Sequence, residues 1–123
     1  MPALRVLVVE DDVGLCAIYE RILNKMGCQI EIAHDGHSAL QLLRTFNPHL
    51  IFLDMYLPIL NGLTVLEGVA VNPALAQTRV VVASSSRDYE RQILAYSNTE
   101  FILKPIMPTQ IRDIVAQMIE STC

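Results

Sequence analysis

Six side chains that could carry chemistry occupy equivalent places in the sequence, because each lies at or just beyond the end of a short apolar run. They are Glu10, Asp11, Asp12, Asp54, Ser84 and Lys104. Carboxylates that gather at a poorly hydrated place are unfavourable unless a cation accompanies them. Their oxygen atoms suit Mg²⁺, while the ammonium and the hydroxyl could bind the oxygens of a phosphoryl group. The set predicts phosphoryl transfer to a carboxylate, with an aspartate as the covalent acceptor.

The runs that precede these side chains have the composition of strands that are buried on both faces. They are Val6–Val9, Leu50–Leu53, Val80–Ala83 and Phe101–Leu103. A fifth run, Gln29–Ala33, alternates polar and apolar residues and therefore predicts an edge strand with one exposed face. Apolar residues at helical spacing predict helices around residues 15–26, 39–43, 63–69, 89–94 and 111–119. Pro108 fits the first turn of the last helix.

Strict alternation of strands and helices predicts an α/β fold in which helices cover both faces of a parallel sheet. With right-handed crossovers, the doubly wound solution is a flavodoxin-like (βα)5 sandwich with five parallel strands in the order 2-1-3-4-5. A site in such a sheet lies beyond the carboxyl ends of the strands, where the order reverses between the first and third strands. The fold would therefore bring the six side chains to one edge of the sheet.

Composition narrows the classes of function. The chain has 123 residues, of which 52% are hydrophobic and 18% are charged, which indicates one globular domain. A formal net charge of −4 argues against direct binding to nucleic acid. No apolar run is long enough for a signal peptide or a membrane span, so we expect a cytoplasmic protein without membrane contact. Cys16, Cys28 and Cys123 form no C-x-x-C pair, which indicates two buried thiols and one tail thiol rather than a zinc site.

Four marks along the chain together resemble the receiver (CheY-like) domain of a two-component response regulator. They are the runs Val8–Asp12 and Leu53–Gly62, Ser84 at a strand end, and Lys104–Ile106. The resemblance spans nearly the whole chain. It implies that residues 1–123 form one receiver domain, and that no output domain is present.

The resemblance also implies a role for individual residues. Asp54 corresponds to the phosphoacceptor, and Lys104 and Ser84 to the other catalytic residues. Ser84 and Phe101 correspond to the switch residues. A Mg²⁺ site would consist of Asp11, Asp54, Glu10 through a water molecule and the backbone carbonyl of Tyr56, and Asp12 directly follows the acidic pair. The Lys104–Pro105 peptide bond is often cis in this family.

The function implied is that of a signalling switch rather than a turnover enzyme. A sensor histidine kinase or a phosphotransfer protein would donate a phosphoryl group to Asp54, and the receiver would catalyse only its own phosphorylation and dephosphorylation. Ser84 and Phe101 would then shift the surface made by the fourth helix, the fifth strand and the fifth helix. That surface would serve a downstream effector protein or an output domain missing from this chain. The receiver would be a monomer or a phosphorylation-dependent dimer.

The sequence departs from the family pattern between Ser84 and Lys104. This stretch is about two residues short, and the deletion falls between Ser86 and Tyr89. Tyr96 stands where the family commonly has a small residue. Tyr56 and Ser86 occupy positions that commonly tune the lifetime of the phosphoryl group, and a bulky Tyr56 would shield an acyl phosphate from water.

Other functions remain as alternatives. A degenerate receiver would bind proteins independently of phosphorylation. A small aspartyl-phosphate hydrolase usually has an acid two residues beyond its nucleophile, where this chain has Tyr56. A flavodoxin-like cofactor binder would need a phosphate cradle after the first strand, where the acidic residues would repel a phosphate. Which of the three serines at 84–86 faces the site is a question of register, and Ser84 is favoured because it follows the last apolar residue.

Overall fold

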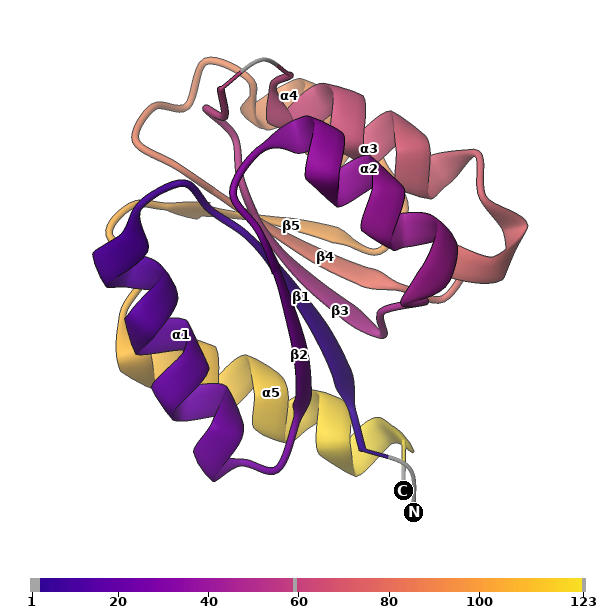
Figure 1. Ribbon diagram of the computed structural model, residues 1–123. Helices are drawn as coiled ribbons and strands as arrows, with labels where there is room; N and C mark the ends of the chain where they lie inside the picture. Colours follow the sequence, from indigo (N-terminus) through magenta and orange to yellow (C-terminus); the bar gives the residue numbers. More distant parts are fainter. Residues whose placement is uncertain (1–2, 59, 123) are drawn as a thin grey trace.

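The computed structural model describes residues 3–58 and 60–122, within which strands and helices alternate along the chain (Figure 1). The elements are β1 (Arg5–Val9), α1 (Val13–Lys25), β2 (Gln29–Ala33), α2 (Gly36–Thr45), β3 (Leu50–Asp54), α3 (Gly62–Ala70), the 3₁₀ turn η1 (Pro73–Leu75), β4 (Arg79–Ser84), α4 (Glu90–Leu94), β5 (Thr99–Leu103) and α5 (Pro108–Thr122). The alternation agrees with the one predicted from hydrophobic periodicity.

The five strands form one parallel sheet in the order β2-β1-β3-β4-β5. The predicted doubly wound fold is therefore confirmed. Helices α1 and α5 cover one face of the sheet, and α2, α3 and α4 lie on the other (Figure 1). Alternate residues of β1 supply the two cores: Leu7 and Val9 pack toward α2 and α3, whereas Val6 and Val8 pack toward α1 and α5. The central strands are consequently apolar along their middle residues, and their polar residues stand at the strand ends.

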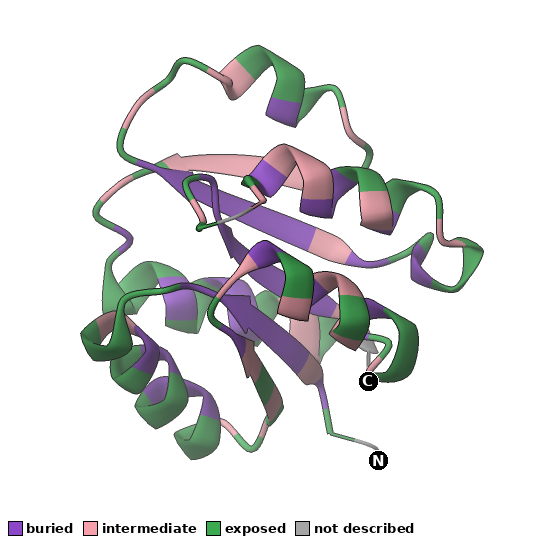
Figure 2. Ribbon diagram, turned by 45° about the horizontal axis from the view of Figure 1, so that its top comes forward, coloured by how far each residue is buried: buried purple, intermediate pink, exposed green. Residues whose placement is uncertain are grey.

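Burial differs between the middle of the sheet and its two edges. Every residue of β3 is buried, while β2 alternates between exposed and half-buried positions before the buried Ala33, as its sequence predicted. The prediction that Phe101–Leu103 is buried on both faces was wrong, because most of β5 is only half-buried and Leu103 is 42% exposed. Strand β5 lies at an edge, and the five-residue α4 covers little of it (Figure 2).

Polar caps determine where three helices begin after the strands. The side chains of Asp12, Asp35 and Asn61 accept hydrogen bonds from backbone N–H groups in the first turns of α1, α2 and α3. Such caps satisfy amide groups that have no partner inside the helix. They therefore fix the points at which the chain leaves the carboxyl edge of the sheet.

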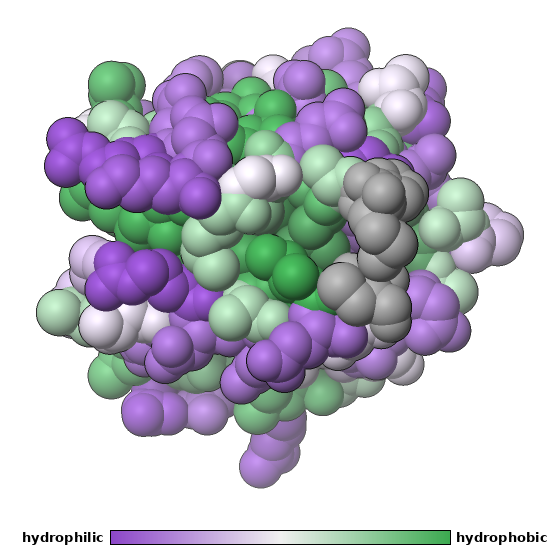
Figure 3. Space-filling view, turned by 90° about the horizontal axis from the view of Figure 1, so that it is seen from below, coloured by the Kyte–Doolittle hydropathy of each residue, from purple (hydrophilic) through white to green (hydrophobic). Residues whose placement is uncertain are grey.

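The face formed by α1 and α5 combines apolar and hydrophilic surface, as Figure 3 shows from below the view of Figure 1. A groove of about 320 Å³ lies between these two helices, and its lining consists of Ala17, Ile18, Arg21, Ile22, Pro108 and Arg112. Within residues 3–58 and 60–122, every helix is too short or too polar to cross a membrane.

Candidate functional site

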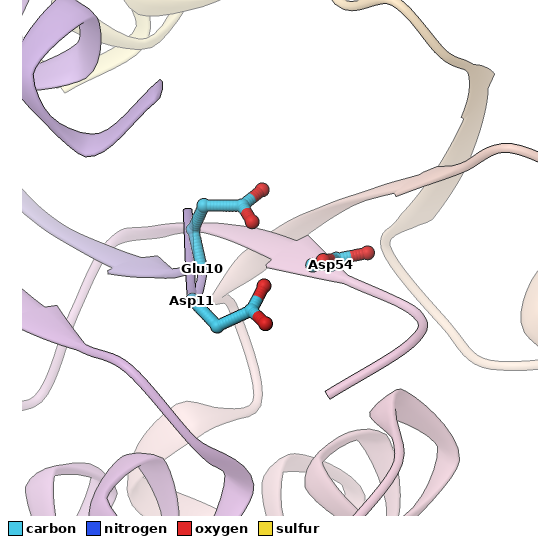
Figure 4. A group of neighbouring side chains, drawn as sticks. All are labelled: Glu10, Asp11 and Asp54. Atoms are coloured by element: carbon cyan, nitrogen blue, oxygen red, sulfur yellow. The ribbon is translucent and has the colours of Figure 1, made fainter. Parts of the chain in front are cut away.

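Three carboxylates meet at the carboxyl edge of the sheet. One oxygen atom from each of Glu10, Asp11 and Asp54 lies within 4.8 Å of the corresponding atoms of the other two. Strands β1 and β3 are neighbours, with Val9 paired to Leu53, so the acids that follow them come side by side. Figure 4 shows the side chains of Glu10 and Asp11 extending toward Asp54. Glu10 and Asp54 are buried, whereas Asp11 is exposed, so the cluster opens to solvent on one side.

Lys104 joins the buried acids from the far edge of the sheet. Its Nζ atom lies 3.2 Å from Asp54 Oδ1 and 3.7 Å from Glu10 Oε1. The backbone N–H of Lys104 donates to the carbonyl oxygen of Ser84 at 2.8 Å, which holds the start of the β5–α5 connection against the end of β4. The Lys104–Pro105 peptide bond is cis, as the resemblance implied.

The charges of this cluster do not balance when all of its groups are ionised. Three carboxylates and one ammonium leave a formal charge of −2. Burial raises the pKa of Glu10 to about 7, and the negative charge of Asp54 acts in the same direction. The N–H of Asp12, 3.1 Å from Glu10 Oε2, and the positive charge of Lys104 act in the opposite direction. A dication would compensate the remaining charge, and an all-oxygen donor set that is open to water fits Mg²⁺.

The backbone around Asp54 is held on several sides. The N–H of Tyr56 donates to Asp54 Oδ1 at 3.2 Å, and the N–H of Met55 donates to the carbonyl oxygen of Ala83. The N–H of Gly62 donates to the carbonyl oxygen of Met55 at 2.8 Å. A Cβ atom at Gly62 would lie 3.0 Å from Met55 Cα and 3.1 Å from the Asp54 carbonyl oxygen. The close approach of α3 to the end of β3 therefore favours glycine at position 62.

Ser84 is the buried member of the serine run. It is 1% exposed, whereas Ser85 is exposed and Ser86 is half-buried. It lies one residue beyond Ala83, the register partner of Asp54 in the adjacent strand. Its Oγ atom accepts a hydrogen bond from the N–H of Ser86 at 3.3 Å. Of the three serines, Ser84 is therefore the buried one beside the strand end that carries Asp54, and its role as the hydroxyl of the site stays a prediction.

A comparison with protein families identifies the class of this chain. Residues 6–116 match the model of the response regulator receiver domain. The chain belongs to this family. Receiver domains of two-component response regulators are signalling switches, and phosphoryl transfer is general to them.

Individual relatives agree with this assignment. The signal receiver domain of a protein described as a LuxO repressor, from Vibrio parahaemolyticus, is 28% identical with a TM-score of 0.85, covering 98% of this chain and 92% of that one. The receiver domain of sensor histidine kinase PA1611 from Pseudomonas aeruginosa PAO1 is 17% identical with a TM-score of 0.84, covering 97% of this chain and 99% of that one. That structure has a magnesium ion coordinated in its active site cleft, and at this identity the likeness shows the fold alone.

Curated relatives are longer than this receiver. The probable C4-dicarboxylate response regulator DctR from Priestia megaterium is 27% identical over 114 residues, which is 91% of this chain but 50% of DctR. The chain spans 26% and 23% of two other relatives. The similarity therefore concerns the receiver portion of those proteins.

Four of the predicted site residues lie together, and a fifth, Asp12, caps a helix instead. Glu10, Asp11, Asp54 and Lys104 form a single cluster. Asp12, by contrast, caps α1, because its Oδ1 accepts a hydrogen bond from the N–H of Leu15 at 3.0 Å. A short polar side chain immediately before a helix is a recognised cap signal, so the sequence already contained this explanation.

Residues that the sequence analysis had not placed at the site also lie beside it. His34 follows β2, and its Nδ1 atom lies 3.1 Å from the carbonyl oxygen of Glu10. The buried Cys16 thiol approaches the same oxygen at 3.4 Å, and burial raises its pKa to about 11. Cys28 is half-buried, Cys16 and Cys28 are free thiols, and Cys123 and Ile59 lie outside the described residues. Only strand pairing brings His34 to Glu10, and the sequence carried no separate signal for it.

Two ring contacts connect the β4–α4 loop with the rest of the receiver. The rings of Tyr56 and Tyr89 meet edge to face, with centroids 6.3 Å apart. The Arg87 guanidinium lies over the Phe101 ring, 5.7 Å from its centroid. Tyr56, Phe101 and Tyr89 were named from the sequence and Arg87 was not, but neither contact was predicted, because spacing alone does not show which side chain a loop residue reaches.

Proposed function

We propose that this receiver accepts a phosphoryl group on Asp54 in a two-component phosphorelay. The observation that carries the proposal is the position of Lys104 Nζ, 3.2 Å from Asp54 Oδ1 within a cluster of three carboxylates. A buried aspartate with a fixed cation beside it and an opening to solvent is suited to taking up an anionic group. Membership of the receiver family supports the same chemistry.

The proposed reaction replaces one bond to phosphorus with another. A carboxylate oxygen of Asp54 bonds to phosphorus while the bond from phosphorus to a histidine nitrogen of the donor breaks. The electron pair of the broken bond stays on that nitrogen. Lys104 stabilises the negative charge of the phosphoryl oxygens, and the Ser84 hydroxyl donates to one of them once the loop that holds it moves.

Glu10, Asp11 and Asp54 are the residues that would hold Mg²⁺, with the backbone carbonyl of Tyr56 as a further predicted ligand. The bound ion would neutralise charge on the transferred group. Asp11 is exposed and therefore leaves the ion site accessible to water and to the incoming phosphodonor.

The donor and the recipient of the signal are proposed from the class of domain. The donor is a sensor histidine kinase or a phosphotransfer protein. The recipient is an effector protein or an output domain that reads the surface formed by α4, β5 and α5. Ser84 and Phe101 connect the acceptor to that surface, because they lie on the two adjacent strands β4 and β5.

The test is the intact mass of the protein after incubation with acetyl phosphate and Mg²⁺. We expect one added phosphoryl group in the wild type, none after Asp54→Asn, and none when EDTA removes the metal. Asp113→Asn is the matched control, because it makes the same chemical change on the exposed side of α5. This variant should gain the same mass as the wild type.

Absence of the adduct at early times, with acetyl phosphate and with a histidine kinase domain, would contradict the proposal. It would favour a degenerate receiver that binds proteins independently of phosphorylation. An adduct that persists in Asp54→Asn would place the acceptor on another residue.

A further inference from the structure

The loop between β4 and α4 is attached to the receiver on both sides by side chains. Tyr89 contacts Tyr56 of the β3–α3 loop, and Arg87 contacts Phe101 of β5. At the start of the loop, the Oγ atoms of Ser84, the last residue of β4, and of Ser86 accept hydrogen bonds from the N–H groups of the residues two positions further along. The position of Ser84 is thus tied to that of the segment that carries Arg87.

Arg87 is held in place although its side chain is 63% exposed. Its Nη1 atom lies 2.8 Å from Glu90 Oε1, and its guanidinium covers the ring of the half-buried Phe101. An exposed arginine has many conformations available, so two simultaneous contacts define one of them. The contact with Phe101 therefore joins a residue of the proposed switch to the loop that follows Ser84.

We propose that Arg87 is a positioning residue that favours the unphosphorylated conformation of this receiver. The inference rests on the proposed function and extends it to a residue with no part in phosphoryl chemistry. The Arg87–Phe101 contact holds the β4–α4 loop toward β5. It therefore opposes any movement that carries Ser84 toward a phosphoryl group on Asp54 or turns the Phe101 ring away from Arg87.

The direction and size of the effect follow from this contact. Removal of Arg87 takes away its contact with the Phe101 ring, which is present before phosphorylation and is lost when the β4–α4 loop and that ring move apart. The variant should therefore adopt the phosphorylated conformation more readily. An exposed cation–π contact corresponds to about a two- to fivefold change in an equilibrium constant.

The test is the affinity for beryllium fluoride, a stable mimic of the phosphoryl group, measured in the presence of Mg²⁺ by amide NMR shifts. We expect Arg87→Ala to bind about two- to fivefold more tightly than the wild type. Arg87→Lys keeps the charge but not the flat guanidinium, and should lie between the two. Arg91→Ala is the matched control, because it removes the same charge from the exposed surface of α4 and should leave the affinity unchanged.

A double-mutant cycle with Phe101→Leu separates the proposed role from a general effect on folding or charge. Leucine keeps an apolar side chain but has no ring, so Arg87→Ala should change the affinity by less than about twofold in that background. An equal effect in both backgrounds would overturn the inference. Weaker binding by Arg87→Ala would also overturn it, because it would mean that Arg87 attracts the anion.

The two proposals fail in different ways. If wild-type protein takes up neither beryllium fluoride nor a phosphoryl group, the proposed function fails and this inference fails with it. If the wild type takes up both and the Arg87 variants match it, only the role of Arg87 is wrong. Urea unfolding of each variant shows whether a changed affinity accompanies a changed stability.

Discussion

The two sides of the candidate site are built differently. On one side, Glu10 follows β1 and Asp54 ends β3, and these two central strands are buried almost completely and paired on both edges. On the other side, Ser84 leads into a loop, and Phe101 lies on the half-buried edge strand β5 beneath a five-residue helix. Figure 2 shows this contrast as purple central strands and a largely pink β5.

The contrast separates the residues proposed to carry out phosphoryl transfer, which must stay in place, from the residues proposed to change conformation in response. Carboxylates and a cation that must hold one geometry need rigid surroundings, which dense packing provides. A segment with few buried contacts opens at low free energy and can change conformation in response to a ligand. We therefore expect β1 and β3 to change little on phosphorylation, and the β4–α4 loop and β5 to change most.

The largest expected effect is a difference in stability when a phenylalanine is truncated to alanine on each of the two sides of the site. Phe52 is 1% exposed, and its ring lies 5.0 Å from that of Tyr19, so Phe52→Ala should lower the free energy of unfolding by about 3–5 kcal/mol. Phe101→Ala should cost only about 1–2 kcal/mol, because the side chain is half-buried. Urea unfolding of both variants measures the difference. Equal losses would mean that the two sides are equally well packed.

Removal of the cation tests the fixed side chemically. Lys104→Met should slow phosphorylation by acetyl phosphate about 100-fold, or about 2.7 kcal/mol in the barrier, because the ammonium that stabilises the phosphoryl oxygens beside Asp54 is then missing. Intact mass against time gives the rate. Lys25, the chain's other lysine, lies exposed at the end of α1, so Lys25→Met should keep the wild-type rate.

A pH dependence of stability should come from Glu10 in metal-free protein. Folding raises the pKa of Glu10 from 4.5 to about 7, mainly through burial, so the folded state binds the proton more tightly than the unfolded state. The stabilisation of the folded state by protonated Glu10 is fully present below about pH 4.5 and is lost as the pH rises to about 7. Glu10→Gln should therefore match the wild type near pH 4 and exceed its free energy of unfolding by about 1–3 kcal/mol near pH 8.

Urea unfolding in EDTA at several pH values measures this difference. Glu31→Gln, on the exposed face of β2, is the control and should follow the wild type at every pH. If the free energies of unfolding of Glu10→Gln and the wild type differed by the same amount at every pH, ionisation of the buried Glu10 carboxyl would not be the cause of the difference.

The smallest effect concerns the ring contact that links the two sides. Tyr56 follows Asp54 closely and meets Tyr89 of the β4–α4 segment. If the ring shields the acyl phosphate from water, Tyr56→Ala should shorten its half-life roughly two- to fivefold, which is less than about 1 kcal/mol in the barrier. Tyr56→Phe keeps the ring and should keep the half-life. Decay of the phosphorylated mass gives both values, and an unchanged half-life in Tyr56→Ala would exclude shielding.

The fold was predictable from the sequence because hydrophobic periodicity and the order of elements leave few topologies. The run Leu50–Leu53 was correctly assigned to a central strand and Gln29–Ala33 to an edge. Phe101–Leu103 was misjudged because an apolar run shows that a strand forms, but not how much cover its neighbours provide. The burial of β5 depends on the short length of α4, and that length depends on tertiary contacts as well as on the helix propensity of its residues.

The residues of the site were predictable where they terminate strands, since parallel strands end at a common edge. Contacts made by loops were not. Arg87 belongs to no periodic pattern, and the helical spacing that includes Tyr89 does not show which ring it meets in another segment of the chain. His34 comes next to Glu10 through the pairing of β1 with β2, which the sequence specified only as an order of strands.

The alternating burial of β2 has a consequence for behaviour at high concentration. This strand lies at the edge of the sheet and presents unpaired backbone groups to the solvent, where a second chain could add as a further strand. Gln29 and Glu31 occupy its exposed positions. A charged side chain on an exposed edge makes such addition unfavourable, because like charges would meet and lose hydration. The polar half of β2 therefore protects the folded chain from aggregation through that edge.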